Sequence, residues 1–496
     1  MQRSLDLPRM AMLLCIALLA CEFATLVTRS VWVDEAMLLK AVMELKSPVD
    51  FFKPLTYYDQ AEPAFASLFF KTAMSIVEYD IRALRTAVLL LSCLLISPML
   101  LIFRRYRWGI PVFLLVLISH EFSTGLYLTE LKHYFLEVCA SFLAIFGLYK
   151  AQQNQNPYWP AAMAAAVSIM GFSTLVVSGG LLVYGFSMCI KQPWDKTSTH
   201  KLAVLGICAM VVAAEYVFMK RLTLYQIGNY EHFYASSAFG SLPILAKAIV
   251  GAYGKALLLA SGIASTALLF SRHRGFAFKL NVFFIGLVAF VVIGRVTGFY
   301  PVNTSRHLIW LAPFSLVIVS LAILEFAASP KTYTKGLGWL LLSIVSIQAI
   351  KMGMSVAQGV NYEYVDNNHF YRFIADMPPT RFLVYPDAQP SLEYYSLLLP
   401  QLNKHQYVRV YDELTHKRDP SRAQAEYDES LVEMLSHRQM ADFSVLVSHV
   451  NLDTDITGRG KALETEIARM NCTYVSYFYV YNAQLISVHC PGDAAL

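Results

Sequence analysis

The sequence predicts an α-helical protein that crosses a membrane many times and ends in a folded α/β domain outside the cytoplasm. Of its 496 residues, 56% are hydrophobic and only 15% are charged, whereas soluble domains are about a quarter charged. The apolar residues gather in stretches of roughly 17–25 residues, the length of helix that crosses a bilayer core. From about residue 353 the composition is that of an ordinary soluble domain. The chain therefore divides into a membrane region, residues 1–352, and a soluble domain, residues 353–496.

We predict about eleven membrane helices from these apolar stretches. They cover residues 10–28, 82–103, 109–128, 133–149, 158–171, 174–190, 201–219, 249–270, 279–297, 307–325 and 336–352. The stretch 158–190 is interpreted as two helices, because one long helix would move the later basic loops to the other side of the membrane.

Short loops rich in lysine and arginine then all fall on one side. They contain Arg104, Arg105, Arg107, Lys150, Lys191, Lys196, Arg272, Arg274, Lys331 and Lys335. The positive-inside rule makes that side the cytoplasm. An odd number of helices with the N-terminus inside places the C-terminal domain outside.

The first outer loop, residues 29–80, is long and rich in aromatic residues and carboxylates. It is not apolar enough to span a bilayer. Its run Ala64–Val77 is amphipathic, which favours a short helix lying at the membrane interface. The net charge of +5 reflects the basic loops, and no patch of mixed basic and aromatic residues indicates a nucleic-acid partner.

The C-terminal domain alternates strand-like and helix-like segments, which predicts an α/β sandwich. Strands are expected at Phe382–Tyr385, Tyr407–Tyr411 and Ser444–Val447, and helices near 391–402, 423–437 and 460–470. Two further β-rich runs, Thr473–Val480 and Gln484–His489, close the domain.

The eight cysteines fall into two groups. Six of them are expected to be small core residues, because they lie in or beside apolar segments: Cys15, Cys21, Cys93, Cys139, Cys189 and Cys208. The other two, Cys472 and Cys490, each lie nine residues from Tyr481, so a hairpin centred there places them opposite one another. Outside the cytoplasm such a pair can oxidise, and we predict a disulfide, with two unpaired thiols as the alternative.

The strongest local motif is Trp32-Val33-Asp34-Glu35-Ala36, directly after the first helix. Adjacent side chains on a helix diverge by about 100°, so the two carboxylates cannot do the same job. The alternative is an ordinary solvated helix start.

Three more motifs lie at the same outer face. Asp59 and Glu62 precede Pro63 in the first outer loop, and Asn303-Thr304-Ser305-Arg306-His307 begins a late helix. Glu130, His133, Tyr134 and Glu137 have the spacing of one helical face. Glu137 falls within the membrane, where an ionisable group faces a cavity or a partner, either as a functional residue or in a satisfied structural network.

The order of these motifs resembles the GT-C fold glycosyltransferases that use polyprenyl-phosphate sugars. This family includes protein O-mannosyltransferases, lipid A aminoarabinose transferases and rhizobial lipopolysaccharide sugar transferases. Its Asp-Glu pair matches Asp34 and Glu35, its D-x-H-x-P stretch matches 59–63, its "ALR" matches 83–85, and its E-x-R-x-Y segment matches 130–134. The Arg306-His307 pair followed by Pro313 completes the order, and the resemblance covers roughly residues 10–325.

The chain departs from the family pattern at two positions. Ala61 stands where the second motif has histidine, and Lys132 stands where the third has arginine. Lysine cannot form the bidentate fork that arginine forms with a phosphate. These departures put the family's donor contacts in question for this chain.

The resemblance implies a membrane glycosyltransferase that moves a sugar from a polyprenyl-phosphate donor to a hydroxyl of a glycan, lipid or protein acceptor. A polyprenyl phosphate leaves as a stable anion, so one carboxylate base suffices, unlike the acid and second carboxylate of a glycosidase. Asp34 is the expected catalytic base, and Glu35 is the second expected catalytic residue, which orients Asp34 or the acceptor. Phosphate binding is expected from Arg306, His307, Lys132 and Tyr134, with support from Asp59, Glu62, Glu130 and Glu137.

No cofactor is expected to be required, with Mg or Mn as the open alternative. The implied location is the inner membrane of a bacterium, with the active site facing the periplasm. Two rival functions remain: a flippase or transporter of lipid-linked sugars, and an inactive accessory protein of the same fold. A transporter would show internal repeats, and no clear repeat is present.

Overall fold

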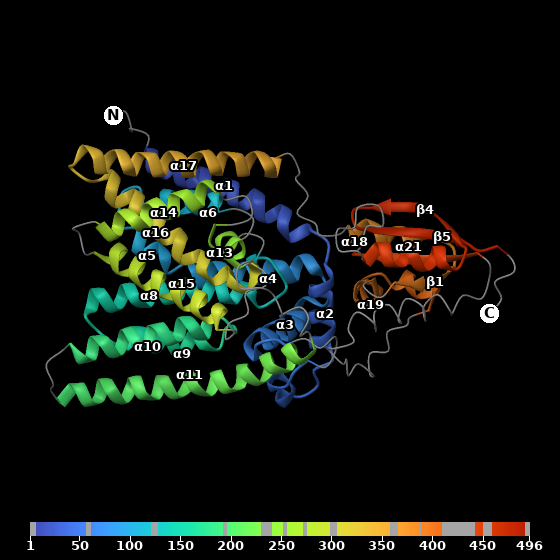
Figure 1. The fold of residues 1–496 in the computed structure, drawn as a ribbon, viewed down its shortest axis with the longest axis horizontal. Helices are drawn as coiled ribbons and strands as arrows, with labels where there is room; N and C mark the ends of the chain where they lie inside the picture. The colour runs from blue at the N-terminus through green and yellow to red at the C-terminus, as the bar shows by residue number, and fades with distance from the viewer. Residues whose placement is uncertain are drawn as a thin grey trace.

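The computed structural model describes most of the chain. The described residues are 6–55, 61–120, 127–191, 196–229, 241–250, 255–270, 275–297, 305–357, 366–385, 388–408, 442–449 and 459–491. A helix bundle forms one end of the molecule and the C-terminal domain forms the other, with α2 and α3 of the first outer loop between them (Figure 1).

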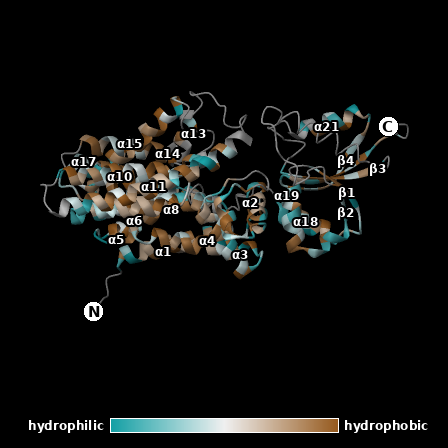
Figure 2. Cartoon of the chain, turned by 90° about the horizontal axis from the view of Figure 1, so that it is seen from below, coloured by the Kyte–Doolittle hydropathy of each residue, from teal (hydrophilic) through white to brown (hydrophobic). Residues whose placement is uncertain are grey.

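Seven described segments are long and apolar enough to cross a membrane, and they make the protein a polytopic membrane protein, as predicted. They lie in α1 (Leu7–Thr28), α4 and α5 (Ile81–Ile96 and Met99–Phe103), α8 (Tyr134–Asn154), α11 (Lys196–Asn229), α15 (Phe276–Val296), η3 and α16 (Ser305–Leu311 and Ala312–Ala327) and α17 (Thr332–Ala357). These helices are mostly hydrophobic, whereas the C-terminal domain carries many hydrophilic residues (Figure 2).

The other four predicted membrane helices are present, but each is shorter than the seven segments described above. They are α6 (Gly109–Ser119), α9 (Tyr158–Ser168), α10 (Thr174–Ile190) and α14 (Lys255–Phe270). The stretch 158–190 forms two separate helices, α9 and α10, that pack against one another, so the two-helix interpretation is confirmed. An additional helix, α13 (Ser241–Val250), precedes α14 and was not predicted separately.

The centre of the bundle is formed by α8 and α16. Their apolar stretches are 83% and 94% buried, compared with 17% for α1 and 11% for α11, which lie at the periphery. The loops that join α5 to α6 and α16 to α17 lie at the same end of the bundle as the start of α1, opposite the C-terminal domain (Figure 1). This is the arrangement that the basic loops predict.

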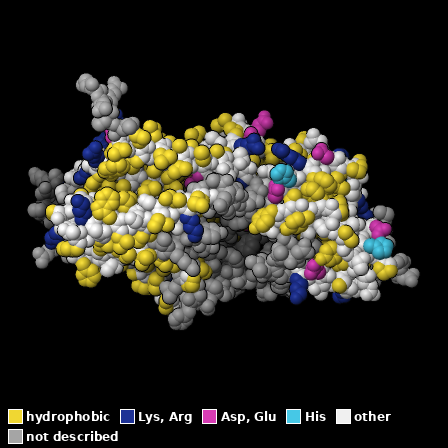
Figure 3. All heavy atoms as spheres, turned by 90° about the horizontal axis from the view of Figure 1, so that it is seen from above, with side chains coloured by type: hydrophobic (Ala, Val, Ile, Leu, Met, Phe, Trp, Pro, Cys, Tyr) yellow, Lys and Arg dark blue, Asp and Glu magenta, His cyan; other side chains and the backbone are white. Residues whose placement is uncertain are grey.

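The first outer loop folds into α2 (Val33–Met43), the 3₁₀ helix η1 (Pro48–Phe52) and α3 (Ala64–Val77). The predicted helix at 64–77 is therefore confirmed. On the face drawn in Figure 3, hydrophobic side chains spread over the bundle, and most acidic and histidine side chains lie over the C-terminal domain.

The C-terminal domain is a mixed five-stranded sheet with helices. Its elements are α18 (Asn367–Asp376), β1 (Arg381–Val384), α19 (Gln389–Leu398), η5 (Pro400–Lys404), β2 (Gln406–Val408), β3 (Asp442–Ser448), α21 (Arg459–Arg469), β4 (Thr473–Val480) and β5 (Ala483–His489). The strand order is β2-β1-β3-β5-β4, with β1 parallel to β2 and β3, and β5 antiparallel to β3 and β4. The three predicted strands correspond to β1, β2 and β3; residues 409–411 and the predicted helix at 423–437 lie outside the described residues.

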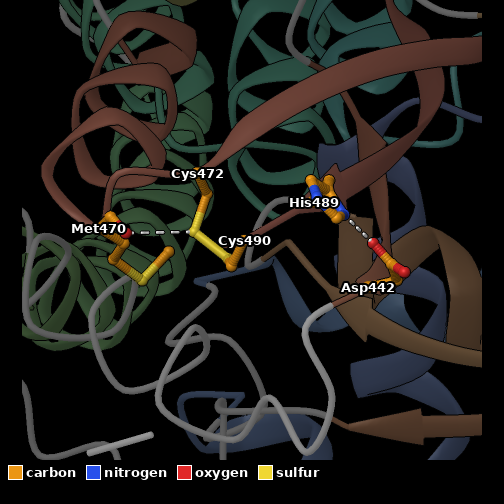
Figure 4. The surroundings of a disulfide bond; sticks show 5 residues. All are labelled: Asp442, Met470, Cys472, His489 and Cys490. Atoms are coloured by element: carbon orange, nitrogen blue, oxygen red, sulfur yellow. Dashed lines mark hydrogen bonds and ion pairs between the residues drawn. A yellow bond between two sulfur atoms is a disulfide. The ribbon is translucent and has the colours of Figure 1, made fainter. Parts of the chain in front are cut away.

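The terminal hairpin brings Cys472 and Cys490 together in a disulfide with Cα atoms 4.2 Å apart (Figure 4). Next to the turn, Val480 pairs with Ala483. If this register continued along the hairpin, Cys472 and Cys490 would be out of register by one residue. An irregularity between Ser476 and Phe478 adds one residue to β4 and restores the pairing of Thr473 with His489. The predicted bridge therefore depends on a β-bulge that the sequence analysis did not foresee.

Removing this bridge should lower the stability of the C-terminal domain. The closed loop is short, so the Cys472→Ser/Cys490→Ser variant should lose about 3 kcal/mol, measured as a lower melting temperature of the purified protein. The matched control replaces Cys21 and Cys93, two exposed free thiols of the bundle, and should leave the melting temperature unchanged. Free thiols at 472 and 490 in a non-reduced digest of protein from native membranes would contradict the bridge.

Candidate active site

The two carboxylates at the start of α2 lie in different surroundings. Glu35 is completely buried, whereas Asp34 is only partly buried. Both lie in the first turn of the helix, where negative charge stabilises the helix dipole. The divergence expected for adjacent helical residues is therefore realised, and the two side chains have separate partners.

Glu35 is the centre of a buried ionic network. Its Oε1 accepts from Arg29 Nη2 at 3.0 Å and from the Leu131 backbone N–H at 3.0 Å. Its Oε2 accepts from Arg85 Nη2 at 2.7 Å and from the Trp32 backbone N–H at 3.3 Å. Both oxygens are thus fully engaged, and the side chain is 0% exposed.

This network joins segments that are distant in sequence. Arg85, on α4, also donates to the backbone carbonyls of Arg29 and Ser30 at the end of α1. Leu131 belongs to the segment that leads into α8. Three of the motifs, at 34–35, 83–85 and 130–134, therefore meet at one buried carboxylate.

Glu35 stays ionised in this network. Burial alone would raise its pKa, but the charges of Arg85 and Arg29, with the Leu131 N–H, hold the pKa below its usual value. An ionised carboxylate balanced by two guanidinium groups and two N–H donors satisfies the requirement that buried charges be paired. Glu35 therefore fixes the geometry of the α2 start.

The C-terminal domain docks directly on this region. Asn367 Nδ2 donates to the backbone carbonyl of Val31 at 2.9 Å, and the Asn368 N–H donates to Ser30 Oγ at 2.9 Å. The Tyr394 hydroxyl donates to the carbonyl of Tyr79 at 2.7 Å, beside the start of α4. The outer end of α1, the start of α2 and the C-terminal domain thus form one junction.

Asp34 interacts electrostatically across this junction with His449, which follows β3. The His449 backbone has φ 68°, a left-handed conformation, and its N–H donates to the Asn482 carbonyl at 2.8 Å. The Ser391 hydroxyl lies 2.7 Å from His449 Nε2, and Asn367 Nδ2 lies 3.3 Å from it.

Asn367 is held by several partners beside His449. The Ser448 hydroxyl donates to Asn367 Oδ1 at 2.7 Å, and Asn367 Nδ2 donates to Ser391 Oγ at 3.2 Å. His449 Nε2 thus lies within hydrogen-bond distance of both Ser391 and Asn367. Burial lowers the pKa of His449 to about 3, against the opposing effect of the Asp34 charge.

A second cluster of ionisable groups surrounds His133, at the start of α8. His133 Nδ1 lies 2.8 Å from Glu62 Oε2, and both side chains are buried. Burial favours the neutral ring, but the charges of Glu62 and Glu137 raise the pKa of His133 above its usual value. The cluster therefore places a buried histidine beside two acidic side chains, Glu62 and Glu137.

Glu137 is held by the turn between α9 and α10. Its Oε1 accepts the backbone N–H of Ser173 at 2.9 Å, and the Ser173 hydroxyl donates to the His307 carbonyl at 3.2 Å. A Cβ on Gly171 would lie 2.3 Å from Glu137 Cγ, so only glycine lets this turn approach the carboxylate. The Tyr134 ring lies 4.5 Å from His133 and 6.5 Å from His307 between ring centroids.

The remaining predicted site residues lie around these clusters. Glu130 and Lys132 are buried, and the charge of Lys132 acts on His133. Lys132 follows Leu131, so it lies between the Glu35 network and the His133 cluster. Asp59 is outside the described residues, and for Arg306 only the backbone, in η3, is described. Among the described residues, no group of three or more histidine, cysteine or acidic side chains could hold a metal ion.

Four residues of the junction were not predicted from the sequence. Arg29, Ser391, Asn367 and His449 carry no recognisable motif, and three of them lie more than 330 residues from Glu35. Arg29 offered one signal, because an arginine directly after the first helix stands six residues before a glutamate. His449 offered none.

Comparisons with known proteins agree with this fold. No protein-family model and no curated protein sequence matches the chain. Two crystal structures of ArnT from Cupriavidus metallidurans, bound to undecaprenyl phosphate and in the apo state, match with a TM-score of 0.50. They are 12% and 13% identical in sequence, and the match covers 96% of this chain and 97% of that chain. ArnT is a GT-C lipid A aminoarabinose transferase, so this chain has the GT-C fold.

Breaking the Glu35 network should unfold the outer junction. Glu35→Gln leaves Arg29 and Arg85 buried without a counter-charge, which costs about 3–5 kcal/mol for a buried ion pair. We expect a clear fall in melting temperature in detergent. Asp50→Asn, a change at a partly exposed carboxylate of the same loop, is the control and should cost little. Equal melting temperatures for the two variants would contradict a structural role of Glu35.

The junction should weaken in acid because of His449. Between the usual pKa of 6.5 and the folded value of about 3, the unfolded chain binds a proton that the folded chain does not. Lowering the pH through this window therefore destabilises the fold. His449→Asn removes this contribution while tolerating the left-handed backbone. As the pH falls from 7 to 5, the free energy of unfolding of the variant should rise by about 1–2 kcal/mol relative to that of the parent, measured by thermal unfolding. A difference that does not change with pH would rule out the neutral histidine.

Proposed function

We propose that this chain is a glycosyltransferase that moves a sugar from a polyprenyl-phosphate donor to a hydroxyl of a glycan, lipid or protein acceptor. The observation that carries the proposal is the placement of Asp34, which a buried ionic network holds at the junction of bundle, outer loop and C-terminal domain. The GT-C fold supports it, as does the binding of undecaprenyl phosphate by the structurally similar ArnT.

Asp34 acts as the general base in this proposal. Its carboxylate accepts the proton of the acceptor hydroxyl while that oxygen bonds to the anomeric carbon of the sugar. The bond from that carbon to the phosphate oxygen breaks, and polyprenyl phosphate leaves as an anion that needs no protonation. Glu35 is unsuited to proton transfer because both its oxygens are occupied, and it acts as a positioning residue for α2.

The donor phosphate is proposed to lie on the other side of Leu131. Arg306 is the first candidate to bind it, followed by Lys132, with His307 and Tyr134 beside them. Ser173 contacts both the His307 carbonyl and Glu137. Glu62 contacts His133, so Glu62 and Glu137 together hold the residues around the proposed phosphate site in place. Asp59 and Glu130 complete the proposed site.

The proposal assigns residues 1–352 to the catalytic region and residues 353–496 to an extracytoplasmic domain. It places the chain in the inner membrane of a bacterium, with Asp34 on the periplasmic side. The reaction as written uses no metal; Mg or Mn at the phosphate is the alternative.

One observation favours a second candidate, an inactive protein of the same fold. The family histidine is Ala61 here and the family arginine is Lys132. One contact argues against this second candidate. His133 contacts Glu62, which follows Ala61, so an imidazole is present here although position 61 has no histidine. Release of labelled polyprenyl phosphate from synthetic undecaprenyl-phosphate sugars separates an enzyme from an inactive protein and from a flippase, which would move the donor intact.

Asp34→Asn should abolish transfer without unfolding the protein. Loss of a general base reduces turnover on the order of a hundredfold or more. The measurement is release of labelled polyprenyl phosphate by purified protein, with melting temperature as the folding check. Asp50→Asn, in the same outer loop, is the control and should retain turnover. Near-full turnover in Asp34→Asn would show that another group is the base.

A further inference from the structure

A long groove lies on the helix bundle between α10, α11 and α15. Its first part has a volume of about 550 Å³ and is lined almost entirely by apolar side chains, among them Val176, Tyr216 and Phe290. Its second part, of about 520 Å³, reaches the ends of α8 and α10. Both parts are lined by Gly180, Val183, Val282 and Phe283, so they form one continuous groove.

Glycines keep the floor of the groove open. A Cβ on Gly179 or Gly286 would meet nothing within 4 Å, whereas a Cβ on Gly180 would lie 2.9 Å from the Phe283 ring. From Leu175 to Lys191 the groove follows sixteen residues of α10, about 24 Å. This length exceeds the roughly 15 Å hydrocarbon depth of one leaflet, so the groove accommodates an extended acyl chain.

Positive charge lies at one end only. Lys191, the C-cap of α10, and Lys279, in the first turn of α15, are exposed and line the second part. Neither forms a salt bridge with any described residue. Gln152 Oε1, at the same end, has no hydrogen-bond partner within the described part of the chain.

This end is opposite the candidate active site. Helix α10 begins beside Ser173, which contacts Glu137 and His307, and it ends at Lys191. A polyprenyl-phosphate donor would place its phosphate at the Ser173 end. The lysines therefore fit a lipid whose phosphate lies at the other membrane surface, the one that carries the basic loops.

We propose that this groove binds an anionic phospholipid. One acyl chain lies along Gly179 and Gly286, the phosphate contacts Lys191 and Lys279, and a headgroup hydroxyl donates to Gln152. The site is independent of the proposed transferase reaction.

The charge is tested by native mass spectrometry of the full-length protein with added phosphatidylglycerol and phosphatidylethanolamine. Lys191→Ala/Lys279→Ala should lower phosphatidylglycerol retention roughly tenfold or more and leave phosphatidylethanolamine unchanged. Lys331→Ala/Lys335→Ala removes two exposed lysines from the loop region of α17 and is the control. Equal losses in the two double variants, or equal retention of both lipids by the parent protein, would overturn the proposal.

The groove itself is tested by filling it. Gly286→Leu should lower retention at least fivefold while the helix is retained, because leucine favours helix over glycine. Gly336→Leu, at a glycine of α17 with equally open surroundings, is the control. Unchanged retention in Gly286→Leu would overturn the proposal, and so would displacement of phosphatidylglycerol by added undecaprenyl phosphate, which would assign the groove to the donor.

Discussion

The junction of the helix bundle, α2 and the C-terminal domain depends on one buried carboxylate. Glu35 binds two arginines and two backbone N–H groups from three separate segments, and two of these partners, Arg85 and Leu131, lie 50 and 96 residues away in sequence. Buried ion pairs add little net stability compared with apolar packing, but they are intolerant of wrong partners. The network joins α1, α2 and α4, and an arrangement that separated them would leave a buried charge without its partner.

The partition between Asp34 and Glu35 follows from this constraint. With Glu35 directed into the bundle, helical geometry turns Asp34 away from it, toward the C-terminal domain. The neutral His449 adds no positive charge beside Asp34, and its ring is fixed by Ser391 and Asn367. The two adjacent carboxylates therefore have different surroundings: Glu35 is paired with two arginines, and Asp34 faces His449.

Much of this architecture was predictable from the sequence. Apolar stretches marked the helices, basic loops marked one end of the bundle, and the spacing of Cys472 and Cys490 marked the bridge, although the bulge after Ser476 was not foreseen. The site was predictable only where its residues are neighbours in sequence, as in Asp34-Glu35 or His133-Glu137. Partners such as Asn367 and His449 lie on a separate domain, and no local pattern encodes a contact across that distance.

The contact between the C-terminal domain and the start of α2 can form only late in synthesis. Val31 follows the first helix of the chain, yet its partner Asn367 comes 336 residues later. At roughly 5–20 residues per second of synthesis, the start of α2 waits about 20–70 s for this contact. During that interval Glu35 can pair with Arg29 and Arg85, but the C-terminal domain does not yet cover the start of α2. The junction is thus complete only after the last membrane helix has been made, so chains truncated before α18 lack this cover.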